Sequence, residues 1–186
     1  MANFNISQFT ANMKGGGARP NLFKLRIPSI PSSVSVRTGL SDIEFFCKSV
    51  SGLPASTLGT IEIPYFGRTV KFAGDREFAE LTTTIINEED MKVRNIMDSW
   101  INSMNNMKDN TSKTDFGSRN DFSSIINLTT YKKDGDIDQQ FAFQKCWPSA
   151  VSSIDLNWDS TNSIQEFTVT CNMTIINILM RSNEIL

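Results

Sequence analysis

Alternating apolar and polar residues predict that the chain is mainly β. The clearest run lies near the C-terminal end and places polar side chains between Phe167, Val169, Cys171, Met173 and Ile175. This period of two puts one face of a strand in a core and the other face outside it. Shorter runs of the same kind predict further strands over residues 21–27, 43–50, 57–63, 69–73, 77–86, 125–131 and 137–143.

One segment has helical spacing instead. Its apolar residues recur three or four positions apart, at Val93, Ile96, Met97, Trp100, Ile101 and Met104. We therefore expect a helix over 88–105 whose apolar stripe packs on the sheet. Asn87 is the expected N-cap and Asp90 the acid of a capping box, so the run 88–90 reads as a first helical turn in preference to a metal site. Seven or eight strands and one helix indicate a β-sandwich or barrel with an attached helix.

Turn-forming residues divide the strands. Asp134-Gly135-Asp136 predicts a hairpin turn, and the calcium-loop alternative lacks glycine and glutamate at the required positions. Gly74-Asp75-Arg76 predicts a turn between two strands, and Cys146-Trp147-Pro148 predicts a strand end. The triplet Gly15-Gly16-Gly17 precedes no Gly-Lys-Ser/Thr, so it indicates a flexible arm and not a phosphate loop.

These signals predict one domain over 21–175, preceded by an N-terminal arm (1–20) that orders on a partner and followed by a C-terminal tail (176–186). The polar residues 106–124 predict a mobile loop within that domain.

Segment 52–72 combines many apolar residues with two prolines, which suit a central strand poorly. Its composition favours two interpretations equally: an ordinary edge hairpin, or a projecting hairpin that buries its apolar side against another molecule. In the second case the residues for self-assembly are Leu53, Leu58, Ile61, Ile63, Tyr65, Phe66 and Arg68.

The composition of the chain excludes several classes of function. The chain has 186 residues, a net charge of −2 and a pI of about 5.2, which is not the balance of a protein that holds nucleic acid tightly. It contains no histidine, and so no Ser-His-Asp or Cys-His nucleophilic site. Its three cysteines form no Cys-x-x-Cys and fit core positions. We expect no catalytic, cofactor or metal site, no signal peptide and no membrane insertion.

Several short words, in order from about residue 17 to 170, carry a family resemblance. They are 17–23 (GARPNLF), 45–48 (FFCK), 53–59 (LPASTLG), 63–68 (IPYFGR), 73–78 (AGDREF), 86–90 (INEED), 93–95 (VRN), 154–158 (IDLNW) and 164–167 (IQEF). In this series the chain resembles the tail tube proteins of contractile-tailed bacteriophages. It departs from them in a divergent loop over 109–124 and in an end over 171–186 that lacks aromatic residues.

The resemblance implies a structural subunit in which each chain adds strands to the continuous inner β-barrel of a hexameric ring. Stacked rings would form a conduit for DNA ejection inside a contractile sheath. A polar lumen without cations would let DNA slide without specific binding. The candidate lumen-facing residues are Glu80, Thr82, Thr84, Thr168, Thr170, Asn172 and Thr174.

The implied partners are further copies of the chain, a sheath protein, a baseplate hub or initiator, a tape-measure protein and a tail terminator. The implied location is the virion tail, after synthesis and assembly in the host cytoplasm. A tube-like baseplate or tube-initiator protein, and the inner-tube subunit of a phage-like secretion or injection particle, are alternatives within the same class. A carboxylate enzyme using Asp75, Glu77 or Asp155, and a monomeric binding module using 52–72, are alternatives from other classes.

Overall fold

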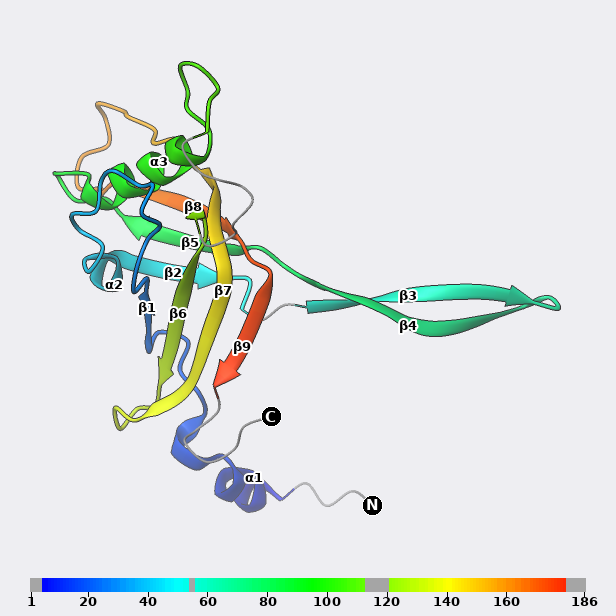
Figure 1. The fold of residues 1–186 in the computed structure, drawn as a ribbon. Helices are drawn as coiled ribbons and strands as arrows, with labels where there is room; N and C mark the ends of the chain where they lie inside the picture. Colours follow the sequence, from blue (N-terminus) through cyan, green and yellow to red (C-terminus); the bar gives the residue numbers. More distant parts are fainter. Residues whose placement is uncertain (1–4, 54–55, 113–120, 180–186) are drawn as a thin grey trace.

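The computed structural model describes residues 5–53, 56–112 and 121–179, and within them most of the chain is β (Figure 1). Seven strands form one sheet of order β1-β6-β7-β8-β5-β2, with β9 also paired to β7, and β3 and β4 form a separate two-stranded sheet. The strands are β1 (Phe23–Arg26), β2 (Cys47–Ser51), β3 (Ser56–Tyr65), β4 (Arg68–Phe78), β5 (Leu81–Ile86), β6 (Ser124–Tyr131), β7 (Ile137–Val151), β8 (Glu166–Asn172) and β9 (Ile175–Leu179). The α-helices are α1 (Ile6–Asn12), α2 (Ile43–Phe46) and α3 (Lys92–Met104).

Strand β7 joins the two halves of the large sheet. Its first part pairs with β6 and β9, and its last part pairs with β8, so the two sets of strands cross in Figure 1. Lys145 has a φ of 58° and lies in a register irregularity of the β6–β7 ladder, just before the last pair of that ladder, Ser124 with Cys146. The expected strand end at residues 146–148 is therefore wrong. The strand continues because a register irregularity between Pro148 and Ala150 accommodates a residue that cannot donate to the ladder.

Helix α3 covers the core, as its apolar spacing predicts. Val93, Ile96, Met97 and Trp100 are buried against the strands. The indole Nε1 of Trp100 also donates a hydrogen bond of 2.8 Å to the carbonyl of Phe122. This bond satisfies the one polar atom of a side chain that lies deep in the core.

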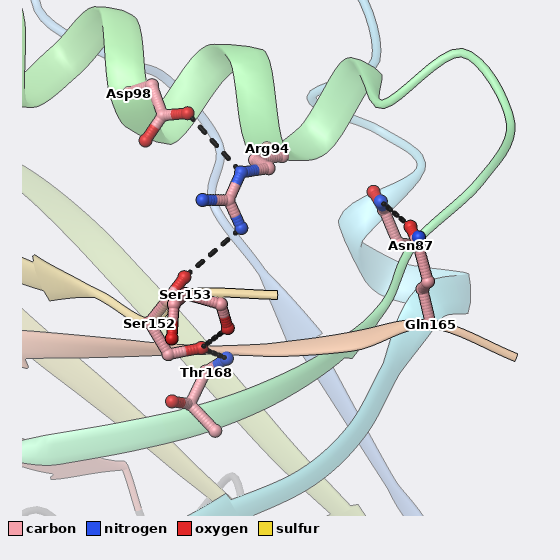
Figure 2. Close-up of polar contacts among 7 residues, drawn as sticks. All are labelled: Asn87, Arg94, Asp98, Ser152, Ser153, Gln165 and Thr168. Atoms are coloured by element: carbon pink, nitrogen blue, oxygen red, sulfur yellow. Dashed lines mark hydrogen bonds and ion pairs between the residues drawn. The ribbon is translucent and has the colours of Figure 1, made fainter. Parts of the chain in front are cut away.

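The predicted start of this helix is wrong. The helix begins at Lys92, and the preceding Met91 has a φ of 49°. Asn87 does not cap it. Instead its backbone N–H donates to the carbonyl of Gln165 at 2.9 Å. Its side-chain Nδ2 donates to Oε1 of Gln165 at 3.0 Å (Figure 2). The acidic run 88–90 consequently forms a loop before α3, where Glu88 and Asp90 pair with Lys92.

Polar contacts hold α3 to the strand ends beneath it. Arg94 pairs with Asp98 at 3.5 Å and donates a hydrogen bond of 3.2 Å to the carbonyl of Ser152 (Figure 2). The Arg94 guanidinium also lies 5.5 Å from the ring centroid of Phe167 on β8. Helix and sheet therefore form one packed body.

Three other predictions need correction. Residues 43–46 form one helical turn, α2, because Phe45 and Phe46 donate to the carbonyl of Asp42; the strand begins only at Cys47. Gly74 lies inside β4 and not in a turn. The last alternating run ends at Asn172, after which the chain reverses into β9, so residues 176–179 of the expected tail belong to the sheet.

The Asp-Gly hairpin prediction is confirmed. Gly135 has a φ of 93° and its N–H donates to the carbonyl of Lys132, while Asp134 Oδ1 accepts from the N–H of Asp136. Helix α1, whose residues are all exposed, lies in the predicted arm 1–20. Residues 1–4, 113–120 and 180–186, parts of the predicted arm, loop and tail, lie outside the described residues.

Candidate functional site

Strands β3 and β4 form a long hairpin that projects from one side of the body (Figure 1). Within the described part of the chain, β3 and β4 pair with each other and with no other strand. Every residue of β3 is exposed, as are nearly all residues of β4. A two-stranded hairpin alone in water is at best marginally stable, so an element of this kind normally packs on something else.

The register gives this hairpin two chemically different faces. Directly opposed residues share a face, and Ile61 opposes Phe72 while Ile63 opposes Val70. The intervening pairs place Glu62 and Lys71 on the other face, where they form an ion pair of 2.8 Å. One face of the ribbon is therefore apolar and the other is polar.

The apolar face continues to the tip of the hairpin. Tyr65 opposes Arg68 on this face. Phe66 and Gly67 form the turn, with φ values of 44° and 75°. The ring of Phe66 is 90% exposed and packs edge-on against Tyr65, with centroids 4.7 Å apart. The hairpin thus ends in an aromatic pair and a cation.

Two close backbone approaches shape the hairpin. A Cβ on Gly74 would lie 3.0 Å from the backbone of Gly59 on the partner strand. At the base, a Cβ on Gly52 would lie 2.1 Å from the carbonyl oxygen of Glu80, and Gly52 has a φ of 85°. Only glycine permits this contact, which joins the chain entering the hairpin to the chain leaving it.

The strands β2, β5, β8 and the end of β7 form a second candidate surface. On β5, Leu81, Thr83 and Ile85 are buried, while Thr82 and Thr84 are half-buried on the opposite face. On β8, Thr168, Thr170 and Asn172 likewise lie opposite buried residues. Thr82 pairs with Thr170, and Thr84 pairs with Thr168, so the two candidate lumen sets form one continuous face.

This polar face extends to both neighbouring strands. Ser49 and Ser51 pair with Thr84 and Thr82 on β5, and Ala150 pairs with Thr170 on β8. The strand residues between carry no charge. Charges appear only at the ends of the face, where Lys48 pairs with Glu166 at 2.5 Å and Glu80 is exposed. The sequence predicts that Thr174 shares this strand face. In the structure Thr174 instead lies beyond β8, in the turn to β9.

Cys146 and Cys171 are buried in the core, and Cys47 is half-buried against it. Burial raises the pKa of Cys47 to about 11 and the pKa values of Cys146 and Cys171 to about 12, because the thiolate is poorly solvated inside the protein. Among the described residues, no group of three or more histidine, cysteine, aspartate or glutamate side chains could hold a metal ion. Within those same ranges, no helix has the length and apolar character needed to cross a bilayer.

Most candidate assembly residues lie together on the hairpin. Leu58, Ile61, Ile63, Tyr65, Phe66 and Arg68 belong to it, whereas Leu53 lies at its base. The apolar face is completed by Val70 and Phe72, which are absent from the assembly residues predicted from the sequence. Their alternation within the strand predicted at 69–73 was the signal for them. The acids of the enzyme alternative are spread out: Asp75 and Glu77 lie on β4, and Asp155 lies between β7 and β8.

A family model for the phage tail tube protein matches residues 18–174, almost the whole described chain. The chain belongs to the phage tail tube protein family. It is therefore a structural tail tube subunit, and the resemblance seen in the sequence is confirmed. The tail tube protein gp19 of Enterobacteria phage T4 is 27% identical over 157 residues, covering 84% of this chain and 88% of that protein. The tail tube protein of Serratia phage KSP90 is 23% identical over 164 residues, covering 88% and 90%.

Solved structures confirm the tube-type fold. A chain of the sheath-tube complex of the PVC extracellular contractile injection system aligns with a TM-score of 0.59 at 16% identity, covering 96% of this tail tube protein and 99% of that chain. A chain of the cap of the anti-feeding prophage aligns with a TM-score of 0.61 at 17% identity, covering 88% and 91%.

Proposed function

We propose that this tail tube protein assembles into hexameric rings, and that the rings stack into a hollow conduit for DNA ejection inside a contractile sheath. It acts as a building block and not as an enzyme. Its partners are further copies of itself, the sheath protein, a baseplate hub or initiator, the tape-measure protein and the tail terminator. Its location is the virion tail, after assembly in the host cytoplasm.

The observation that carries this proposal is the projecting hairpin with one apolar face. Five side chains of that face, on both strands, are between 45% and 67% exposed: Ile61, Ile63, Tyr65, Val70 and Phe72. Such a face is costly in water, since each buried side chain of this size contributes about 1.5–3 kcal/mol when it leaves solvent. Ring stacking would bury it, and the same contact would order the hairpin.

The polar face of β2, β5, β8 and β7 suits the lumen of such a tube. Threonine and serine side chains hydrate well and offer DNA phosphates no cation. The outer strands of this four-stranded part, β2 and the end of β7, can each pair with a neighbouring copy, which would remove the free edges and close the ring.

Electron microscopy of concentrated protein tests the proposal. Wild-type protein, seeded with tail baseplates where necessary, should form stacked hollow rings. A variant carrying Ile63→Ser and Phe72→Ser should fold but fail to stack, because both changes place polar groups on the apolar face.

Glu62→Gln is the matched control, since it alters the polar face of the same strand and should leave stacking intact. Uniform monomers of the wild-type protein, even with baseplates present, would contradict the proposal and favour a monomeric binding module.

A further inference from the structure

The hairpin needs a surface to receive it, and the opposite side of the body carries one. Two neighbouring segments, 87–91 and 152–165, lie on the side away from the hairpin (Figure 1). A backbone hydrogen bond and a side-chain hydrogen bond between Asn87 and Gln165 join the two segments, the second of which is drawn in Figure 2. We call these two segments the receiving surface.

The receiving surface exposes large apolar side chains. Trp158 is fully exposed, Leu156 is 79% exposed and Ile164 is 70% exposed. These three lie close together in the sequence, on a segment without regular structure. An exposed apolar group of this kind, bordered by polar residues, is typical of a protein interaction site. It matches in chemistry the apolar face of the hairpin.

The charges of the two surfaces are complementary. Residues 88–90 are three consecutive acids, and only Lys92 offsets them locally. Glu89 is exposed and forms no ion pair within the described chain. Arg68, next to the hairpin tip, also forms no ion pair among the described residues and lies on the apolar face. A guanidinium is suited to bidentate pairing with a carboxylate.

The relative position of the two surfaces selects the kind of contact. Different patches on opposite sides of one molecule make a head-to-tail contact that can repeat without limit. The hairpin has the reach for this, since a ten-residue strand spans about 33 Å. An isologous contact, in which hairpin meets hairpin, would stop after two rings.

We propose that the hairpin of one copy docks on the receiving surface of a copy in the next ring, with Arg68 against the acidic loop and the apolar face against Trp158 and Ile164. This inference rests on the proposed function and names the partner surface of its hairpin.

Charge reversal tests the polar part of the contact. Arg68→Glu and Glu89→Arg should each raise the protein concentration needed for tube formation roughly tenfold or more, whereas the double variant should recover to within about threefold of wild type. Lys71→Gln, on the polar face of the hairpin, is the control and should leave this concentration unchanged. Ultracentrifugation and electron microscopy provide the readout. If both single variants lost tube formation and the double variant did not recover it, the pairing of Arg68 with Glu89 would be contradicted.

Mixing tests the head-to-tail geometry. One protein carries Ile63→Ser and Phe72→Ser in the hairpin; the other carries Trp158→Ser and Ile164→Ser in the receiving surface. Each alone should give rings that do not stack, whereas their mixture should give pairs of rings and no tubes, because only one of the two contacts can form. Melting curves should match the wild type, since all four side chains are exposed.

The outcomes separate the two proposals. Wild-type protein that forms no tubes would overturn the proposed function and this contact with it. Tubes that survive the Trp158→Ser and Ile164→Ser changes but not the hairpin changes would overturn the receiving surface alone. Loss of sheath binding, with stacking preserved, would assign the receiving surface to the sheath and overturn the contact equally.

Discussion

The strands of the body and of the hairpin in this tail tube protein alternate in the same way, but their apolar sides have different surroundings. In the body, β5 and β8 alternate between buried and half-buried residues, and the buried side reaches α3. In the hairpin, β3 and β4 alternate just as regularly, yet the apolar side faces solvent. The difference lies in what covers the apolar side: in the body it is covered by other elements of the same chain, whereas no element among the described residues covers the apolar face of the hairpin. An alternating pattern therefore predicts a strand without saying which molecule covers it.

The largest expected effect separates stability from assembly. Trp100→Ala should lower the free energy of unfolding by about 3–5 kcal/mol, because it removes a fully buried indole and leaves its cavity. Phe72→Ala, an aromatic truncation in the hairpin, should change it by less than about 0.5 kcal/mol while abolishing tubes. Urea denaturation measures both. Equal destabilisation by the two changes would mean that the hairpin packs on its own body.

The second expected effect concerns the base of the hairpin. Gly52→Ala should cost about 1–3 kcal/mol or displace the hairpin, because its Cβ would meet the Glu80 carbonyl oxygen at a positive φ. Gly67→Asn at the tip is the matched control. Gly67 also has a positive φ but no atom within 4 Å of an added Cβ, and asparagine tolerates this conformation. Thermal unfolding of the two variants should differ clearly, and equal losses would count against a rigid base.

Much of this comparison could be predicted from the sequence, because local patterns carry it. The spacing from Val93 to Trp100 predicts the buried face of α3, and the alternation in 166–172 predicts both faces of β8. The prolines and apolar residues of 52–72 raised the possibility of a projecting hairpin.

What could not be predicted depends on pairing between distant strands. Gly74 predicts a turn from the sequence, but in the structure it lies where the backbone of β4 closely approaches Gly59 of β3. The reversal after Asn172 breaks no pattern, since β9 continues the apolar run on another neighbour, β7. The union of the two threonine sets into one face follows only from the pairing of β5 with β8.

The third expected effect uses the polar face. Thr84→Lys with Thr168→Lys, opposite each other on β5 and β8, should make tubes retain DNA at low salt and release it at high salt. Thr84→Gln with Thr168→Gln is the uncharged control and should behave as wild type. Co-sedimentation of DNA fragments with tubes at two salt concentrations measures this. Lysine variants that never retain DNA would place this face outside the lumen.

The smallest expected effect is a pH dependence of the free energy of unfolding that comes from buried thiols of the body. The raised pKa values of Cys146 and Cys171 mean that these thiols stay protonated in the folded body while they ionise near 9.0 in the unfolded chain. Stability should therefore be constant with respect to these groups below about pH 9 and fall as the pH rises toward about 12. The Cys171→Ala variant should show a shallower alkaline loss in denaturant titrations than the wild type. If the Cys171→Ala variant lost stability with rising pH as steeply as the wild type, the raised pKa of Cys171 would be contradicted.

Hydrogen exchange of the free subunit and of assembled tubes, compared region by region, tests the central claim most directly. Amides of 56–78 should exchange rapidly in the free subunit and become protected in tubes, whereas those of β5, β8 and α3 should be protected in both. A hairpin already protected in the free subunit, or still rapidly exchanging in tubes, would contradict the claim that its partner is another copy of the chain.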